Sequence, residues 1–271
     1  MAHLKLRGLI LRLVNVKDYD RYITILTRDA GLISVFARGI RRGKNKLAAR
    51  CQLFTFGDFQ IFSYKGRYSL DDAEIVYSFR NLQSDLLRLS AASQLAALVI
   101  DHVHEKEEAP PFYELLVRAC YELDRGKKDP YMLTWLAQMK MMNFMGYQPD
   151  LELPGSAAGQ KPSQNETFYF DYRRAQLLTP REGQKALKDP RSPVSPVSGP
   201  LLSLLRYLEH CPIERTFSVR SDPGTVNELG QFTLRYLAEH LEKSYDTFSA
   251  FKDFALPPKD PSAREDSPPP Q

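Results

Sequence analysis

Cysteine is scarce in this sequence. The 271 residues contain three cysteines, Cys51, Cys120 and Cys211, which lie far apart, and no two of them have the spacing of metal ligands. An odd number of dispersed thiols argues against a disulfide framework. A reducing compartment fits this pattern best, so a cytoplasmic protein is expected.

Long hydrophobic runs are also absent. The apolar stretch near the N-terminus is only a few residues long before Arg12 interrupts it, so it is too short and too charged for a signal peptide or a membrane span. No later segment is suited to span a membrane. The composition is 43% hydrophobic and 26% charged, which is ordinary for a globular protein with a buried core. At this length, two or three compact units are expected.

The charge is distributed unevenly along the chain. Residues 1–80 contain 15 Lys and Arg against 7 Asp and Glu, a balance of +8, whereas the remainder contains 22 against 26, a balance of −4. Such an asymmetry is typical of a domain that meets a polyanion. A solvated basic surface would give the same numbers, so charge alone does not decide between the two.

The first 80 residues have the pattern of a small β-barrel. Five runs rich in Val, Ile, Leu, Phe, Tyr and Thr are predicted as strands: 5–14, 22–28, 32–38, 52–64 and 67–77. Turn residues at 29–31 and 65–66 favour tight hairpins. Because five short antiparallel strands leave exposed edges unless the sheet closes, we expect a five-stranded oligonucleotide-binding (OB) barrel.

Helical spacing follows the barrel. Leu82, Leu86, Leu89, Leu95 and Val99 recur at intervals that predict a helix. Further helices are predicted for residues after Pro110-Pro111 up to Gly126, after Asp129-Pro130 up to Gly146, and at 201–208 and 226–245.

Residues 147–199 show little periodicity, and we interpret them as an elaborated loop with a small hairpin at 167–172 and 175–178. The fold class is therefore α+β, and four parts are expected: an OB-type barrel at 1–80, a helical domain at 81–146 and 200–256, an insertion at 147–199, and a proline-rich disordered tail at 257–271.

The most distinctive chemistry lies just after the third predicted strand. Six cations fall within 13 residues with no acidic residue among them: Arg38, Arg41, Arg42, Lys44, Lys46 and Arg50. The flanking glycines allow the backbone to turn, and arginine offers flat forks to phosphate oxygens. We interpret this run as a DNA-backbone contact rather than a loop that only aids solubility.

Other residues could extend this surface. Lys17, Arg21 and Arg28 could lengthen the basic track, and aromatic rings such as Phe36, Tyr64 and Tyr68 could stack on bases. In a small barrel such rings are more often part of the core.

Order and spacing of the motifs from Asp18 to Thr55 resemble the N-terminal signature of the RecO family. The resemblance rests on Asp20-Arg21, on Leu26-Thr27-Arg28-Asp29-Ala30-Gly31, on Ala37-Arg38-Gly39-Ile40-Arg41-Arg42 and on Leu53-Phe54-Thr55. A later junction, Phe144-Met145-Gly146-Tyr147-Gln148-Pro149, is similar to the family's Leu-Gly-Tyr-x-Pro sequence. The likeness covers roughly residues 1–180 and is weaker beyond.

The resemblance implies a non-enzymatic bacterial DNA repair and recombination mediator. Such a protein has an OB barrel and a helical domain, binds single- and double-stranded DNA, and anneals complementary strands. It also helps RecR to load RecA onto strands covered by single-strand-binding protein. A cytoplasmic, nucleoid-associated location without a membrane partner follows from the same likeness.

The insertion departs from that family pattern. Where relatives carry two Cys-x-x-Cys pairs, this chain has Gly155-Ser156-Ala157-Ala158-Gly159 and Thr179-Pro180-Arg181-Glu182. Neither stretch offers a thiolate, and 147–199 contains no cysteine or histidine. Because zinc needs about four Cys or His ligands, we predict no metal and no cofactor. A zinc-ribbon-like unit held by Phe168, Phe170 and Leu178 is expected instead.

The helix before Gly146 is a second departure. Relatives carry arginines there that can bind the tail of single-strand-binding protein, whereas Met132 to Met145 contains only Lys140. That contact is therefore not assigned to particular residues.

Catalytic interpretations find little support. His102, His104 and the glutamates that follow do not share one helix face. Asp71 and Asp72 are neighbours on a strand and so point to opposite sides. No phosphate-binding loop motif occurs. A nuclease is therefore disfavoured, and the main alternative is a non-catalytic adaptor whose barrel binds an acidic protein.

Overall fold

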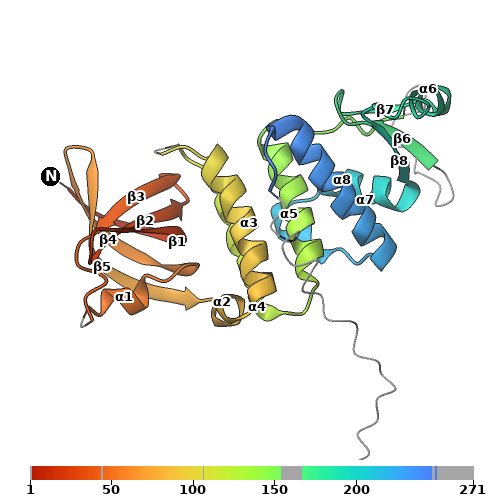
Figure 1. The fold of residues 1–271 in the computed structure, drawn as a ribbon. Helices are drawn as coiled ribbons and strands as arrows, with labels where there is room; N and C mark the ends of the chain where they lie inside the picture. Colours follow the sequence, from red (N-terminus) through yellow and green to blue (C-terminus); the bar gives the residue numbers. More distant parts are fainter. Residues whose placement is uncertain (1, 44, 106, 154–166, 246–247, 249–271) are drawn as a thin grey trace, which may run out of the picture.

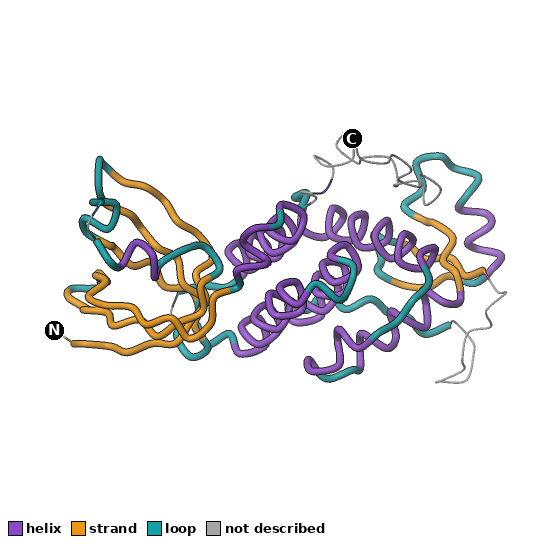
Figure 2. Tube along the Cα trace, turned by 90° about the horizontal axis from the view of Figure 1, so that it is seen from below, coloured by secondary structure: helices purple, strands orange, loops and turns teal. Residues whose placement is uncertain are grey.

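The computed structural model describes residues 2–43, 45–105, 107–153, 167–245 and 248. The expected tail at 257–271 lies outside these residues. So does the stretch 155–159, the first of the two stretches where the family resemblance implied a cysteine pair. Figures 1 and 2 show a barrel at one end, helices in the middle and a small sheet at the other end. Among the described helices, none combines the length and apolar composition needed to cross a bilayer.

The predicted five-stranded barrel is confirmed. Its strands are β1 (Ala2–Val16), β2 (Asp20–Thr27), β3 (Leu32–Ala37), β4 (Thr55–Tyr64) and β5 (Arg67–Ser78). They close in the order β1-β2-β3-β5-β4. A short helix that the sequence analysis missed, α1 (Leu47–Arg50), lies between β3 and β4, so β4 begins three residues later than predicted.

The barrel closes because β1 is long enough to pair with two strands. Its first half pairs with β4 and its second half with β2, and the two sets of partners overlap at Gly8 and Leu9. A Cβ atom at Gly8 would lie 2.5 Å from Ile25 Cγ2 and 2.6 Å from the carbonyl oxygen of Leu26. Only glycine therefore allows this close approach.

The middle of the molecule is helical, as predicted. The elements are α2 (Arg80–Ser84), α3 (Leu86–His102), α4 (Pro110–Arg125), α5 (Pro130–Phe144), α7 (Gly199–His210), the 3-10 helix η1 (Ile213–Ser218) and α8 (Pro223–Leu241). The single helix expected from residue 81 is divided into α2 and α3. Asp85, in an extended conformation, separates them and caps α3 by accepting a hydrogen bond from the Arg88 amide.

Helix α5 is the centre of this region. It is buried nearly all round and packs against α3, α4, α7 and α8. The Met-rich spacing thus belongs to the core, as expected of a helix that is apolar on every side.

The barrel and the helices share one hydrophobic core. Leu9, Leu26, Leu32 and Phe54 at the base of the barrel belong to the same buried cluster as α3, α4 and α5. Polar contacts reinforce the junction, because buried Asp124 of α4 accepts hydrogen bonds from the Leu82 amide, 3.0 Å, and the Tyr77 hydroxyl, 3.1 Å. The barrel is therefore held firmly on the helical part.

The insertion is more regular than the predicted loop. The expected hairpin is confirmed as β6 (Thr167–Asp171) and β7 (Gln176–Leu178), but the structure adds a strand, β8 (Val194–Ser198), and a helix, α6 (Pro180–Ala186). The sheet order is β7-β6-β8. The third strand was not predicted because it contains Pro196, and proline disfavours strands. Proline is tolerated at the edge of a sheet, and β8 is an edge strand.

Candidate nucleic-acid interface

The basic run forms a folded loop at the end of β3. Gly39, with a φ of 62°, turns the chain, and its amide donates to Asp20 Oδ1 at 2.7 Å. The Arg41 amide donates to the carbonyl oxygen of Tyr19 at 3.0 Å. Ile40 is only 1% exposed and inserts into the barrel core. The loop is thus anchored to the β1–β2 turn, and its cationic side chains are left on the outside.

Four of these cations are exposed: Arg38, Arg41, Arg42 and Lys46. Arg41 donates to a backbone carbonyl oxygen, that of Asp18, and the Arg42 guanidinium lies 5.4 Å from the centroid of the Tyr19 ring. Within the described residues, none of the four forms an ion pair with a carboxylate. Their positive charge is therefore available to an anion. Lys44, the fifth cation of the loop, lies outside the described residues.

Three other predicted site residues have different surroundings. Arg21 is half-buried and its Nε donates to Asn15 Oδ1 at 2.9 Å, beside the loop. Arg28 lies at the far end of β2, where it pairs with Glu114 of α4 at 3.1 Å. Arg50 pairs with Asp72 at 3.0 Å. The structure thus brings Arg21 together with the loop, separates Arg28 from it, and gives Arg28 and Arg50 acidic partners of their own.

The aromatic residues near the loop divide into two groups. Tyr68 packs against the barrel core, whereas Phe36 is half-buried on the outer face and lies 5.2 Å from the ring of Tyr22. Tyr64 lies beneath Lys65 on the β4–β5 turn, with 5.4 Å between the Lys65 nitrogen and the ring centroid. Sequence reasoning missed Tyr22 and Tyr19. The inward residue Ile23 would have placed Tyr22 on the outer face by strand alternation.

The stretch from Thr179 to Glu182, which lacks the cysteines that the family resemblance implied, forms the start of α6. Thr179 and Glu182 form a reciprocal capping box at the start of α6, with Thr179 Oγ1 donating to Glu182 Oε2 at 2.6 Å. Phe168, Phe170 and Leu178, the residues expected to hold this unit, are all buried. Across the described residues, no group of three or more His, Cys, Asp and Glu side chains could hold a metal ion.

The carboxylates considered for catalysis have basic neighbours. Asp71 lies 3.3 Å from the His3 ring nitrogen, and Asp72 is held by Arg50. The His102 ring contacts the carbonyl oxygen of Leu98 one helical turn earlier, at 2.9 Å. Each of the three side chains thus has a polar partner within the protein.

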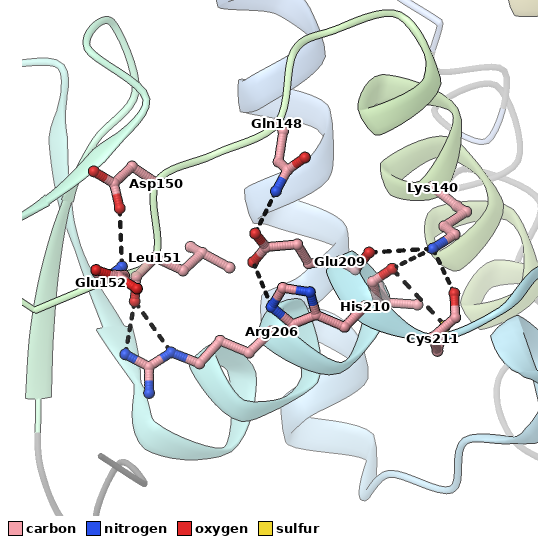
Figure 3. Close-up of polar contacts among 10 residues, drawn as sticks. Lys140, Gln148, Asp150, Leu151, Glu152, Arg206, Glu209, His210 and Cys211 are labelled. Atoms are coloured by element: carbon pink, nitrogen blue, oxygen red, sulfur yellow. Dashed lines mark hydrogen bonds and ion pairs between the residues drawn. The ribbon is translucent and has the colours of Figure 1, made fainter. Parts of the chain in front are cut away.

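Lys140, the one basic residue of α5, points into the protein (Figure 3). Its Nζ donates to the carbonyl oxygens of Leu208 and Cys211, each at 2.7 Å, and of Glu209 at 3.4 Å. These groups end α7, so Lys140 caps that helix from a neighbouring element. With only 5% of its surface exposed, Lys140 is inaccessible to a partner.

Comparison with known proteins agrees with this architecture. The family model described as "Recombination protein O N terminal" matches residues 1–79, and "Recombination protein O C terminal" matches residues 83–247. The DNA repair protein RecO of Bacillus subtilis is 31% identical over 237 residues, 87% of this chain and 89% of that protein. The DNA repair protein RecO of Acetivibrio thermocellus is 27% identical over 252 residues, 93% of this chain and 97% of that protein. The chain therefore belongs to the RecO family of bacterial DNA repair proteins.

Proposed function

We propose that this repair protein binds DNA strands through the loop 38–46 and promotes the annealing of complementary strands without an enzymatic step. The proposal rests on one observation: Arg38, Arg41, Arg42 and Lys46 are exposed and, within the described residues, have no carboxylate partner. Cations of this kind bind phosphates and release counter-ions. Contacts confined to the backbone reduce the repulsion between strands and leave base edges free to pair.

Membership of the RecO family supports a wider role in repair. As for other RecO proteins, we propose that the chain cooperates with RecR, acts on strands covered by single-strand-binding protein and so assists RecA indirectly, at the bacterial nucleoid. Because Lys140 is buried as a helix cap, we do not place a contact with the single-strand-binding protein on that residue. We also retain the division into a barrel at 1–80, helices at 81–146 and 200–256, and an insertion at 147–199 as a proposal.

The decisive measurement is the salt dependence of binding to a labelled single strand. We expect the logarithm of the affinity to fall linearly with the logarithm of salt concentration. Replacing Arg38, Arg41 and Arg42 with Ala should reduce the slope by about 2, since each phosphate contact on a single strand contributes about 0.7. The matched control replaces three exposed cations of the insertion, Lys185, Lys188 and Arg191, and should leave the slope unchanged. A flat salt dependence of the unmodified protein would refute phosphate binding.

Strand annealing by the purified protein, with and without chelator, tests the remainder of the proposal. We expect annealing in both conditions. Magnesium-dependent cleavage of the strand would instead favour a nuclease. Capture of an acidic protein that survives nuclease treatment, with no annealing, would favour the adaptor alternative.

A further inference from the structure

The outer face of the barrel carries a row of rings that begins beside the loop 38–46. Strand register places Tyr22 of β2 opposite Phe36 of β3, Phe36 next to Ser69 of β5, Ser69 opposite Phe62 of β4, and Phe62 opposite His3 of β1. Side chains in register on neighbouring strands point to the same face of a sheet. The five residues therefore form one continuous row across the strands.

The burial pattern shows that this row faces outward. Ile23 and Val35, the neighbours of Tyr22 and Phe36 along their strands, are fully buried inside the barrel. Tyr22 is 43% exposed, and Phe36 and Phe62 are partly exposed. The rings come in two pairs, Tyr22 with Phe36 at 5.2 Å and His3 with Phe62 at 5.1 Å, and Ser69 leaves a low point between them. With strands about 4.8 Å apart, the row is roughly 19 Å long.

The two ends of the row differ in charge. The Tyr22–Phe36 end adjoins exposed Arg38, which lies two residues beyond Phe36 and so points to the same face, whereas Arg21 and Ala37, the neighbouring register pair, point to the opposite face. The other end carries the His3–Asp71 contact. A strand whose phosphates lie on the loop would therefore bring its bases first to Tyr22 and Phe36, whereas Asp71 repels phosphate at the far end.

We infer that the Tyr22–Phe36 pair is a stacking platform for unpaired bases, which lets the barrel favour single strands over duplex. This inference rests on the DNA binding proposed above. Aromatic rings stack on bases of any sequence. A duplex keeps its base faces stacked inside the helix and offers them no surface, so only single strands gain from the platform. The loop would bind the phosphates of single strands and of duplex alike, whereas the rings would raise the affinity for single strands alone.

The test compares oligothymidylate with a blunt duplex of equal length, using a variant with Tyr22→Leu and Phe36→Leu. Leucine keeps an apolar side chain on each strand but removes the ring. We expect roughly tenfold weaker binding of the single strand, with duplex affinity and the salt slope of both ligands unchanged, because stacking involves no charge. Phe62→Leu should have a smaller effect on single strands. Tyr121→Leu, which removes a tyrosine that is 45% exposed on α4, is the control.

The possible results separate this inference from the proposed function. Unchanged single-strand affinity in the double variant, with a steep salt slope retained, would overturn the platform and leave phosphate binding intact. An equal loss of affinity for the single strand and the duplex would also overturn it, because the rings would then be needed for the folded structure and not for base stacking. A flat salt slope in the unmodified protein would refute the proposed function itself. Crosslinking of the unmodified protein to bromodeoxyuridine strands should label β2 and β3, and labelling elsewhere would contradict the assignment even if the variant were unstable.

Discussion

Individual side chains stabilise the contacts between secondary-structure elements in this protein. Lys140 is an example, because its amine is the shared donor for three backbone carbonyls at the end of α7. A cation is well suited to this place, since the end of a helix carries partial negative charge. The only basic residue of α5, to which the sequence analysis assigned no partner contact, thus stabilises the fold.

Replacing Lys140 with Met should destabilise the protein by about 3 kcal/mol, because the side chain keeps its volume but leaves buried carbonyl oxygens without a donor. Urea unfolding followed by circular dichroism would measure the loss. The control, Lys185→Met on the exposed side of α6, should change stability by less than about 0.5 kcal/mol. Equal stability of the two variants would show that the contacts of Lys140 contribute little.

Burial also changes the chemistry of a thiol inside the barrel. Cys51 is fully buried, and desolvation raises its pKa from 9.0 to about 12, although Arg21 and Arg50 nearby act in the opposite direction. The folded protein therefore keeps this thiol protonated at a pH where the unfolded chain releases the proton. Its contribution to stability is fully present below pH 9 and is lost as the pH rises toward 12.

Cys51→Ala should accordingly flatten the alkaline part of the stability profile. Between neutral pH and about pH 10, the unmodified protein should lose on the order of 1 kcal/mol of stability through this group, and the variant should not show that loss. Urea unfolding at both pH values measures the difference. If stability falls with pH equally in the unmodified protein and in Cys51→Ala, burial does not raise the pKa of this thiol.

At the scale of elements, close packing of helices depends on small residues. Helix α8 contacts α5 at Gly230, where an added Cβ atom would lie 2.6 Å from Cη2 and Cζ2 of Trp135. Those atoms belong to a bulky, half-buried ring that packs against the main core, so the ring cannot simply move aside. Glycine is therefore needed at this position despite its low helix propensity.

Gly230→Ala should destabilise the protein by about 1–3 kcal/mol through overpacking, even though alanine favours helices. It should also shift the emission of Trp135, the only tryptophan. Gln231→Ala, one residue along and exposed, should be neutral or slightly stabilising. A stabilised Gly230→Ala variant would mean that the two helices adjust without cost.

The insertion is stabilised by a helix cap and by apolar burial. At Thr179 to Glu182, where the family resemblance predicted a cysteine pair that this chain lacks, the structure has a capping box, and the nearby Phe168 and Phe170 are buried. Hydrogen bonding at a helix start and apolar burial thus provide local order here. The absence of thiolates was evident from the sequence, whereas the capping helix was not, because α6 contains only 7 residues.

For the whole molecule, the shared core predicts how the protein unfolds. Barrel residues such as Leu9 and Phe54 lie in the same cluster as the buried faces of α3 and α4. Asp124 and the Arg28–Glu114 pair add polar contacts across the junction. A boundary with this much buried contact should transmit unfolding from one part to the other.

We therefore expect one cooperative unfolding transition. Trp135 fluorescence reports on the helices, and circular dichroism reports on all elements, so the two urea transitions should coincide. Asp124→Ala should separate them, because it leaves the Leu82 amide without its partner. Two transitions in the unmodified protein would show that the barrel and helices unfold independently.

The surface charge of the barrel was only partly predictable. The sequence identifies the basic run, because no acidic residue interrupts it. It does not reveal that Arg28 and Arg50 face Glu114 and Asp72, which are distant in the chain. Likewise, strand alternation places Tyr22 outward, but the register with Phe36, Ser69 and Phe62 exists only once the barrel has closed.

The barrel, the principal helices, the hairpin of the insertion and the family could all be predicted from the sequence, because periodicity, turn residues and motif order are local properties of the chain. The folded structure was needed to show which cations of the described residues lack a carboxylate partner, that Lys140 faces inward and that rings from four strands share one row. Those features depend on contacts between residues far apart in sequence, and the distances that create them arise only when the apolar faces pack together.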